Sequence, residues 1–123
     1  MSWGGVPPEA RSLALICEDP DAPRGTWVHW VLYNLPTGMT SLPEGIPARD
    51  TLAGGGTHGT NDFGRIGYGG PAPPSGTHRY FFRLYAVGRA LSLPAGASRQ
   101  ELLRAMEGHV LARGELMGTY SRR

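Results

Sequence analysis

Residues 64–87 read GRIGYGGPAPPSGTHRYFFRLYAV, and the character of the sequence changes halfway along this stretch. Glycine and proline crowd the first half, which excludes a regular helix or strand there. From His78 to Val87 the residues alternate between two faces and are rich in aromatic side chains, which predicts a β-strand. Two titratable side chains, His78 and Tyr80, lie at the switch. A stiff loop that leads into a strand is a common way to hold polar groups at the rim of a pocket.

Two further strands are expected earlier in the chain. Residues 12–18 are apolar on both faces, as in an interior strand of a sheet. Residues 26–35, TWVHWVLYNL, give the clearest strand pattern because they are rich in β-branched and aromatic side chains.

Strict alternation along residues 26–35 predicts which side chains share a face. It groups Trp27 with His29 on one face and Val28 with Trp30 on the other. Bulky apolar side chains therefore flank His29, which by itself fits a hydrogen-bonded histidine of the core.

One helix is expected near the C-terminus. Ser98 and Glu101 have the spacing of a capping box, and apolar residues follow at helical spacing. Gly114 is a plausible stop for this helix. Residues 115–121 fit a final short strand.

The stretch 36–63 contains many turn residues and few strand signals. It is expected to be a long surface excursion, and such excursions tend to be functional or mobile. Three polar residues in it are expected to be exposed: His58, Asn61 and Asp62.

The composition indicates one globular, mainly β domain covering residues 1–123. Hydrophobic residues are 40% and charged residues 18%, which is a globular rather than a disordered composition. Nineteen glycines and 11 prolines without a repeat favour many tight turns. The 12 basic residues, all arginine, are scattered and the net charge is +2, which argues against a nucleic-acid partner. No apolar run is long enough to predict a membrane span.

The single cysteine, Cys17, excludes an intrachain disulfide. Its neighbours Leu15 and Ile16 predict a buried, inert thiol. The N-terminal sequence MSWGGVPPEA lacks the basic-then-apolar pattern of a signal peptide. Together these features favour a cytoplasmic location.

The polar residues near strand ends admit three interpretations. The first is an anion pocket, in which the imidazoles of His29 and His78, the hydroxyl of Tyr80 and loop N–H groups are donors. Asp19 or Asp21 would then orient a histidine, although either aspartate alone also fits a turn that caps its own backbone.

The second interpretation is a metal site made of two histidines and an aspartate, but no metal-binding spacing is present. The third is a hydrolase that uses Ser75 with His78, but the Gly-x-Ser-x-Gly motif is absent. The anion pocket is therefore the favoured hypothesis.

Three motifs occur in an order and spacing that resemble the phosphatidylethanolamine-binding protein family. They are DPDAP at 19–23, WVHW at 27–30 and GPAPPSGTHRY at 70–80. The chain looks most like the bacterial and archaeal branch, often called Raf-kinase-inhibitor-like proteins. The similarity extends over nearly the whole chain, from SWGGVP at 2–7 to GELMGTY at 114–120.

The resemblance implies a mainly β fold with a large antiparallel sheet, a smaller second sheet and a C-terminal helix. It also implies a pocket for phosphate-like anions, including a phosphoethanolamine head, with no catalysis and no cofactor. Carried over residue by residue, its binding residues are Asp19, Asp21, His29, Gly70, Pro73, Pro74, His78 and Tyr80. Prokaryotic members of the family are often homodimers.

One departure from the family pattern concerns the N-terminus. Family members have a segment before the residues that match Ser2 to Pro7, and it supplies one or two early strands. Either the start codon is assigned late, or those strands are short or missing here. A trimmed sheet would expose an unpaired edge, which favours a homodimer.

The function expected from the sequence is non-enzymatic binding of a small anion or phospholipid headgroup. A regulatory role, as an inhibitor of a kinase or protease, is a further hypothesis. It is kept separate because such a role depends on the partner protein and does not follow from the fold. The alternatives are a protein-interaction regulator that uses the pocket mouth and residues 36–63, and a weak hydrolase or metal enzyme.

Overall fold

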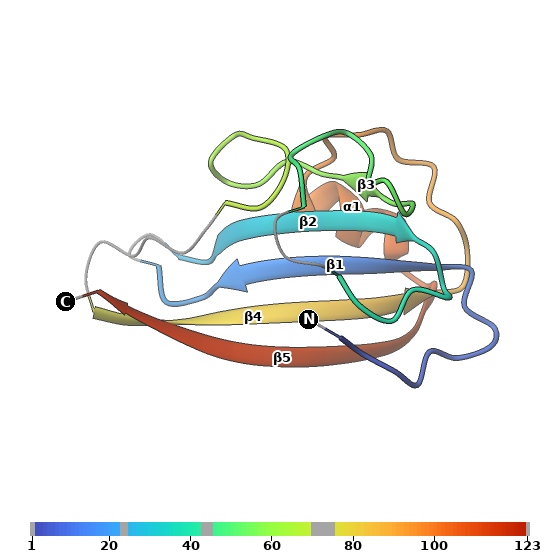
Figure 1. The fold of residues 1–123 in the computed structure, drawn as a ribbon, viewed down its shortest axis with the longest axis horizontal. Helices are drawn as coiled ribbons and strands as arrows, with labels where there is room; N and C mark the ends of the chain where they lie inside the picture. Colours follow the sequence, from blue (N-terminus) through green and yellow to red (C-terminus); the bar gives the residue numbers. More distant parts are fainter. Residues whose placement is uncertain (1, 23–24, 43–45, 70–75, 123) are drawn as a thin grey trace.

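The sequence SLALICED of β1 (Ser12–Asp19) forms the central strand of an antiparallel sheet (Figure 1). All eight of its residues are buried, as expected for a strand that is apolar on both faces. β2 (Trp27–Leu35) and β4 (Gly76–Val87) pair with its two sides. β3 (Thr57–His58) and β5 (Val110–Arg122) complete the order β3-β2-β1-β4-β5.

This computed structural model describes residues 2–22, 25–42, 46–69 and 76–122, with 76–78 and 116–122 described as backbone only. The predicted mainly β fold with an antiparallel sheet and a C-terminal helix is confirmed. Within the described ranges the named strands form one sheet, and the further pairing consists of isolated bridges rather than a second sheet. No helix among the described residues is both long and apolar enough to span a bilayer.

The helix α1 (Arg99–Met106) begins as the sequence predicts but ends earlier. Ser98 and Glu101 form the expected capping box. The helix ends at Met106 with Glu107 as its C-cap, and Gly108 follows with a φ of 79°, which suits glycine. From Val110 onward the chain pairs with β4, so the predicted stop at Gly114 is wrong and the final strand is longer than expected.

Each face of the sheet carries its own core. The helix-side core packs residues of the sheet against Leu102 and Met106 of α1. The loop-side core lies on the other face and is covered by side chains such as Trp3 and Met39, which come from the N-terminal segment and the loop after β2. The loop-side core includes Cys17, which is fully buried.

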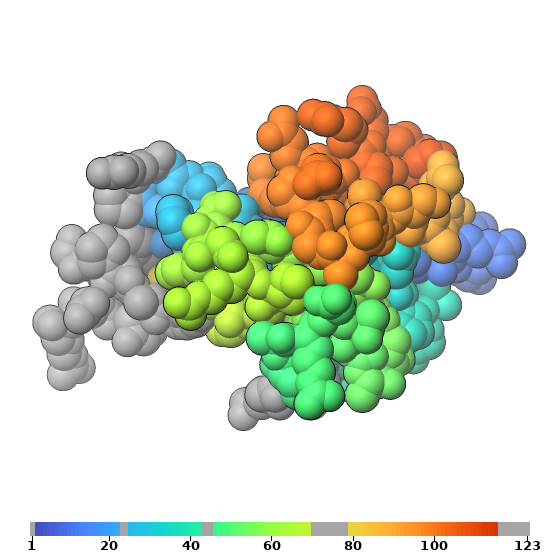
Figure 2. Space-filling view, turned by 90° about the horizontal axis from the view of Figure 1, so that it is seen from above, coloured from blue at the N-terminus to red at the C-terminus, as the bar shows by residue number. Residues whose placement is uncertain are grey.

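The outer edge of β2 is covered by residues 57–69. The N–H groups of Gly59 and Asp62 donate to the carbonyls of Val31 and Val28, each at 2.8 Å. The same segment contacts the approach to α1, because Thr60 N–H donates to the carbonyl of Ala97 at 2.9 Å. Figure 2 shows the two regions side by side on this edge. A paired and covered edge cannot add a further strand.

A buried ionic network joins α1 to the sheet. The Glu18 side chain, 5% exposed, has Arg83 Nε at 2.8 Å and Arg99 Nε at 2.7 Å from its two oxygens. The nitrogen and oxygen atoms of both pairs are close, but their geometry is not that of a hydrogen bond. The attraction between opposite charges therefore holds each pair together. Arg83 also donates to Glu115 of β5 at 2.9 Å. The buried carboxylate is thus paired, as a charge in this position must be.

Substitution of Gly59 tests how tightly residues 57–69 cover β2. A Cβ atom at Gly59 would lie 2.3 Å from the carbonyl oxygen of Ala97 and 2.7 Å from a methyl group of Val31. We expect Gly59→Ala to lower the free energy of unfolding by about 1–3 kcal/mol, because overpacking forces the backbone to shift. Urea denaturation measures this change. Gly4→Ala is the control, since nothing lies within 4 Å of its Cβ position; equal stability of the two variants would contradict the packing.

Cys17 provides a second test of the loop-side core. Burial first, and then the charges of Glu18 and Asp19, raise the pKa of this thiol to about 12. At pH 8 the folded protein therefore holds a neutral, inaccessible thiol. We expect no reaction with a disulfide reagent at pH 8 until denaturant is added. Rapid labelling of the folded protein would show that this core opens.

Candidate functional site

A β-bulge in the pairing of β1 with β2 positions His29. Cys17 pairs with Trp30, but the next residue, Glu18, pairs with Val28, so β2 carries one extra residue at this point. A bulge interrupts the alternation of faces and turns a side chain. Val28 accordingly packs in the helix-side core and Trp30 in the loop-side core. The predicted grouping of Val28 with Trp30 is therefore wrong.

The His29 ring is buried and held by a double contact with one glycine. His29 is only 3% exposed, and its Nδ1 atom lies 2.6 Å from the carbonyl oxygen of Gly69. The N–H of Gly69 donates in return to the carbonyl of His29 at 2.9 Å. A carbonyl only accepts, so Nδ1 carries the proton and the neutral ring keeps its lone pair on Nε2.

Tyr80 of β4 meets His29 from across the sheet. The two ring centroids are 5.0 Å apart with an interplanar angle of 69°, an edge-to-face contact. Tyr80 is 5% exposed. The structure thus brings together two predicted site residues from strands that flank β1. The exposed ring of Phe63 contacts His29 from another side, with centroids 5.6 Å apart.

The two aspartates hold the loop that follows β1. Asp19 accepts the backbone N–H of Asp21 at 2.8 Å, which is the turn predicted for an aspartate in this position. Both carboxylate oxygens of Asp21 accept from the Arg79 guanidinium at 2.8 Å. Asp21 also accepts the backbone N–H of Arg79 at 2.9 Å. The hydrogen bonds from Arg79 to Asp21, and then the charge of Asp21, raise the pKa of the guanidinium.

The other predicted site residues are described only as backbone or not at all. Gly70, Pro73 and Pro74 lie outside the described residues. The His78 backbone belongs to β4 and pairs with Tyr120 of β5, and its side chain is not described. Asp19 is the last residue of β1, His29 lies near the start of β2 and Tyr80 near the start of β4, and these strand ends lie at the left in Figure 1.

Residues 61–69 support the site, and the sequence pattern did not assign them this role. Asn61 is 4% exposed; its Nδ2 donates to the Gly67 carbonyl at 2.9 Å, and its Oδ1 accepts the Phe63 N–H at 2.9 Å. Asp62 is exposed and accepts the Val28 N–H at 2.7 Å. The sequence Asn-Asp-Phe-Gly at 61–64 is a turn signal that could have indicated an ordered loop.

His58 also lies inside the protein, against expectation. It is fully buried at 0% exposed, and its Nδ1 lies 2.6 Å from the carbonyl oxygen of Arg49. Its ring stands 6.2 Å from that of Trp30. The predicted exposure of His58 and Asn61 is therefore wrong, because both side chains point inward and meet backbone groups of neighbouring loop residues. No group of three or more potential metal ligands occurs in the described part of the chain.

The sequence profile of the phosphatidylethanolamine-binding protein family matches residues 1–121. The chain belongs to this family. The match includes both strands that supply His29 and Tyr80.

Several relatives of this family member are similar in sequence. A UPF0098 protein of Methanothermobacter thermautotrophicus is 56% identical over 122 residues, which are 99% of this chain and 81% of the relative. UPF0098 proteins of Pyrococcus horikoshii and Archaeoglobus fulgidus are each 49% identical. This chain spans 62% and 40% of their lengths, respectively.

Two solved structures share the fold. The crystal structure of the phosphatidylethanolamine-binding protein homologue CT736 from Chlamydia trachomatis has a TM-score of 0.90 at 43% identity. The alignment covers 99% of this chain and 79% of CT736. YbcL of E. coli, described as a new member of the mammalian family, has a TM-score of 0.89 at 31% identity. The alignment covers 99% of this chain and 78% of the YbcL chain.

The position of the proton on His29 can be tested directly. We expect ¹⁵N NMR at high pH to show His29 and His58 both protonated on Nδ1, because each faces a backbone carbonyl there. A Cβ atom at Gly69 would lie 2.4 Å from the Phe63 ring, so Gly69→Ala must displace either the ring or the carbonyl. The signals of His29 should change in this variant while those of His58 remain. Protonation of His29 on Nε2 in the unmodified protein would contradict the geometry.

Proposed function

We propose that this family member binds a small anion of the phosphate or phospholipid-headgroup class at the His29 end of the sheet, without converting it. The observation that carries the proposal is the buried contact between His29 and Tyr80, an imidazole and a phenol brought from different strands. The imidazole and the phenol both suit an anionic oxygen. The name of the family, and of its homologue CT736, points to the same class of ligand.

The fixed tautomer of His29 gives the proposed binding a pH dependence. Since Nδ1 faces Gly69, the ring can donate to an anion only from Nε2. In the neutral ring Nε2 is an acceptor, and it becomes a donor when the ring takes up a proton. Binding is therefore stronger at acidic than at alkaline pH, because the imidazolium supplies both a donor and a positive charge.

The acidic loop adds a preference within the same class. Asp19 and Asp21 lie at the end of β1, beside the strand that carries Tyr80, and Arg79 balances the charge of Asp21 while the carboxylate of Asp19 accepts the Asp21 N–H. A headgroup with an ammonium group next to its phosphate would complement both signs of charge. We therefore place phosphoethanolamine ahead of inorganic phosphate as the preferred ligand. Gly70, Pro73, Pro74 and His78 complete the proposed pocket by their match to the family motif.

Calorimetric titration with sulfate at pH 5.5 and pH 8 tests the proposal, because the charge of sulfate is constant over this range. We expect tighter binding at pH 5.5. His29→Gln should weaken it by about 10- to 100-fold, the value of a hydrogen bond to a charged group. His109→Gln, at the opposite end of the sheet, is the matched control. Equal affinity of His29→Gln and the unmodified protein, or unchanged binding by His78→Ala, would contradict the site.

A second titration, with phosphoethanolamine, addresses both the preferred ligand and the absence of catalysis. Phosphorus NMR follows the bound headgroup and any free phosphate at the same time. We expect binding without release of phosphate over days. Turnover that depends on His78 would support the weak hydrolase instead. A regulatory role as a kinase or protease inhibitor would use the mouth of the same pocket. We place this role behind ligand binding as a hypothesis.

A further inference from the structure

The helix α1 is too short to cover the strands that it packs against. It has 8 residues and β5 has 13, so at the usual rise per residue the helix is about 12 Å long and the strand about 43 Å. Tyr85 of β4, Leu103 of α1 and Val110 of β5 pack against the helix-side core but are only partly buried. Apolar surface is therefore left between the end of α1 and the two strands.

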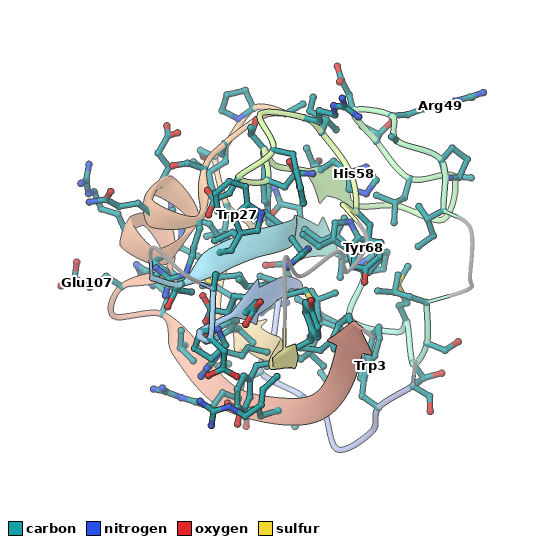
Figure 3. All side chains as sticks on the ribbon, turned by 90° about the vertical axis from the view of Figure 1, so that its left-hand side faces the viewer. Trp3, Trp27, Arg49, His58, Tyr68 and Glu107 are labelled. Atoms are coloured by element: carbon teal, nitrogen blue, oxygen red, sulfur yellow. The ribbon has the colours of Figure 1, made fainter. Side chains whose placement is uncertain are left out.

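This surface lines a groove of about 670 Å³ that is open to solvent. Arg104 of α1 and Arg113 of β5 line the same groove, together with Glu107. Figure 3 views the sheet end on and shows Glu107 on the side of α1, whereas Trp3 and Tyr68 lie on the other side of the sheet. The groove between α1 and β5 is thus on the opposite face from the contact of His29 with Tyr80.

The two arginines of the groove have charges that the protein itself leaves unbalanced. Arg104 and Arg113 are exposed, and neither makes an ion pair with a described residue. Arg83 of β4 and Arg99 of α1 instead share the carboxylate of Glu18. The groove therefore presents guanidinium groups that are available to a carboxylate from outside.

The hydroxyl group of Tyr85 adds a neutral donor to the groove. It makes no hydrogen bond with a described residue. Burial first, and then the charge of Glu18, raise the pKa of Tyr85, so the hydroxyl keeps its proton at neutral pH. The charge of Arg113 is close enough to act on this hydroxyl in the opposite direction. A donor without charge and a guanidinium thus lie near each other beside apolar side chains.

We propose that the groove between α1 and β5 binds an acidic segment of a partner protein, with an apolar side chain of that segment against Leu103 and Val110 and its carboxylates on Arg104 and Arg113. This inference does not depend on the proposed function. Arginine suits the role because its planar guanidinium can donate two parallel hydrogen bonds to one carboxylate. Opposite charges around an apolar centre give such a contact its specificity.

A partner protein fits the groove better than a small molecule or a second copy of this chain. Sites for small molecules bury most of the ligand, whereas an open groove accommodates a segment that lies along it. The acidic residues of this chain are concentrated at residues 18–21. Glu18 and Asp19 are buried, and Asp21 is held by Arg79. A second copy therefore has no free acidic segment to offer.

NMR titration with the peptide acetyl-Glu-Glu-Leu-Glu-Glu-amide at millimolar concentration tests the inference. We expect amide shifts confined to residues 85 and 100–113. The double variant Arg104→Gln, Arg113→Gln should weaken binding about 3- to 10-fold, since each exposed ion pair contributes modestly. Arg49→Gln is the matched control and should bind unchanged, because Arg49 is also exposed without an ion pair to a described residue and lies away from α1 in Figure 3. The same spectra show whether each variant is folded.

Exchange of the charges makes the test specific. The double variant Arg104→Glu, Arg113→Glu should lose the acidic peptide and bind acetyl-Lys-Lys-Leu-Lys-Lys-amide instead. A peptide with glycine in place of leucine should bind the unmodified protein more weakly. Absence of shifts at residues 100–113, or equal binding by all three peptides, would overturn the inference. Sedimentation that shows a dimer disrupted by the Arg104→Glu, Arg113→Glu variant would also overturn it and would assign the groove to a second copy.

Discussion

The extra residue that β2 carries opposite Cys17 and Glu18 is the constraint on which the site depends. With regular pairing, alternation would place His29 beside Val31 and Tyr33, in the core beneath α1. The bulge places its ring against Tyr80 instead, on the side of the loop-side core. A shift of one residue thus decides whether an imidazole packs under a helix or faces a neighbouring phenol. Bulges occur next to binding sites for this reason, since they turn a side chain while leaving the strand in its sheet.

A bulge needs support, because it leaves backbone groups of the bulged strand without ladder partners. Here residues 61–69 supply those partners. The Val28 N–H donates to Asp62, and the Val28 and His29 carbonyls accept from Asp62 and Gly69. The same loop gives the His29 ring its acceptor at Gly69. The segment that satisfies the irregular backbone is therefore also the segment that fixes the proton on Nδ1. Asn61, buried within this loop, holds its turn from inside.

The sequence predicted those features that depend on local pattern. The two apolar faces of residues 12–18 predicted the central strand, and the Ser98–Glu101 spacing predicted the start of α1. The motifs at 19–30 and 70–80 indicated the family, and only the resemblance to that family implied that His29 and Tyr80 lie in one site. The features that failed depend on pairing between distant residues. Val110 pairs with Val87 in the sheet instead of continuing the helix, and the buried ring of His58 lies against the Arg49 carbonyl. A local sequence pattern does not reveal such partners. A bulge in particular can be predicted only when the pairing of both strands is known.

The position of the bulge also separates the structural and functional halves of the sheet. α1 packs in the helix-side core, and its first turn is tied to Glu18 through Arg99. His29 and Tyr80 meet on the opposite face, where the cover is made of loops and not of the helix. The two faces are linked through β1, whose side chains point alternately to each, and through residues 57–69, which contact both the approach to α1 and the ring of His29. Changes in α1 should therefore add only in part to changes at the site. Glu18 is a third link, because its backbone is part of the bulge pairing and its side chain holds α1.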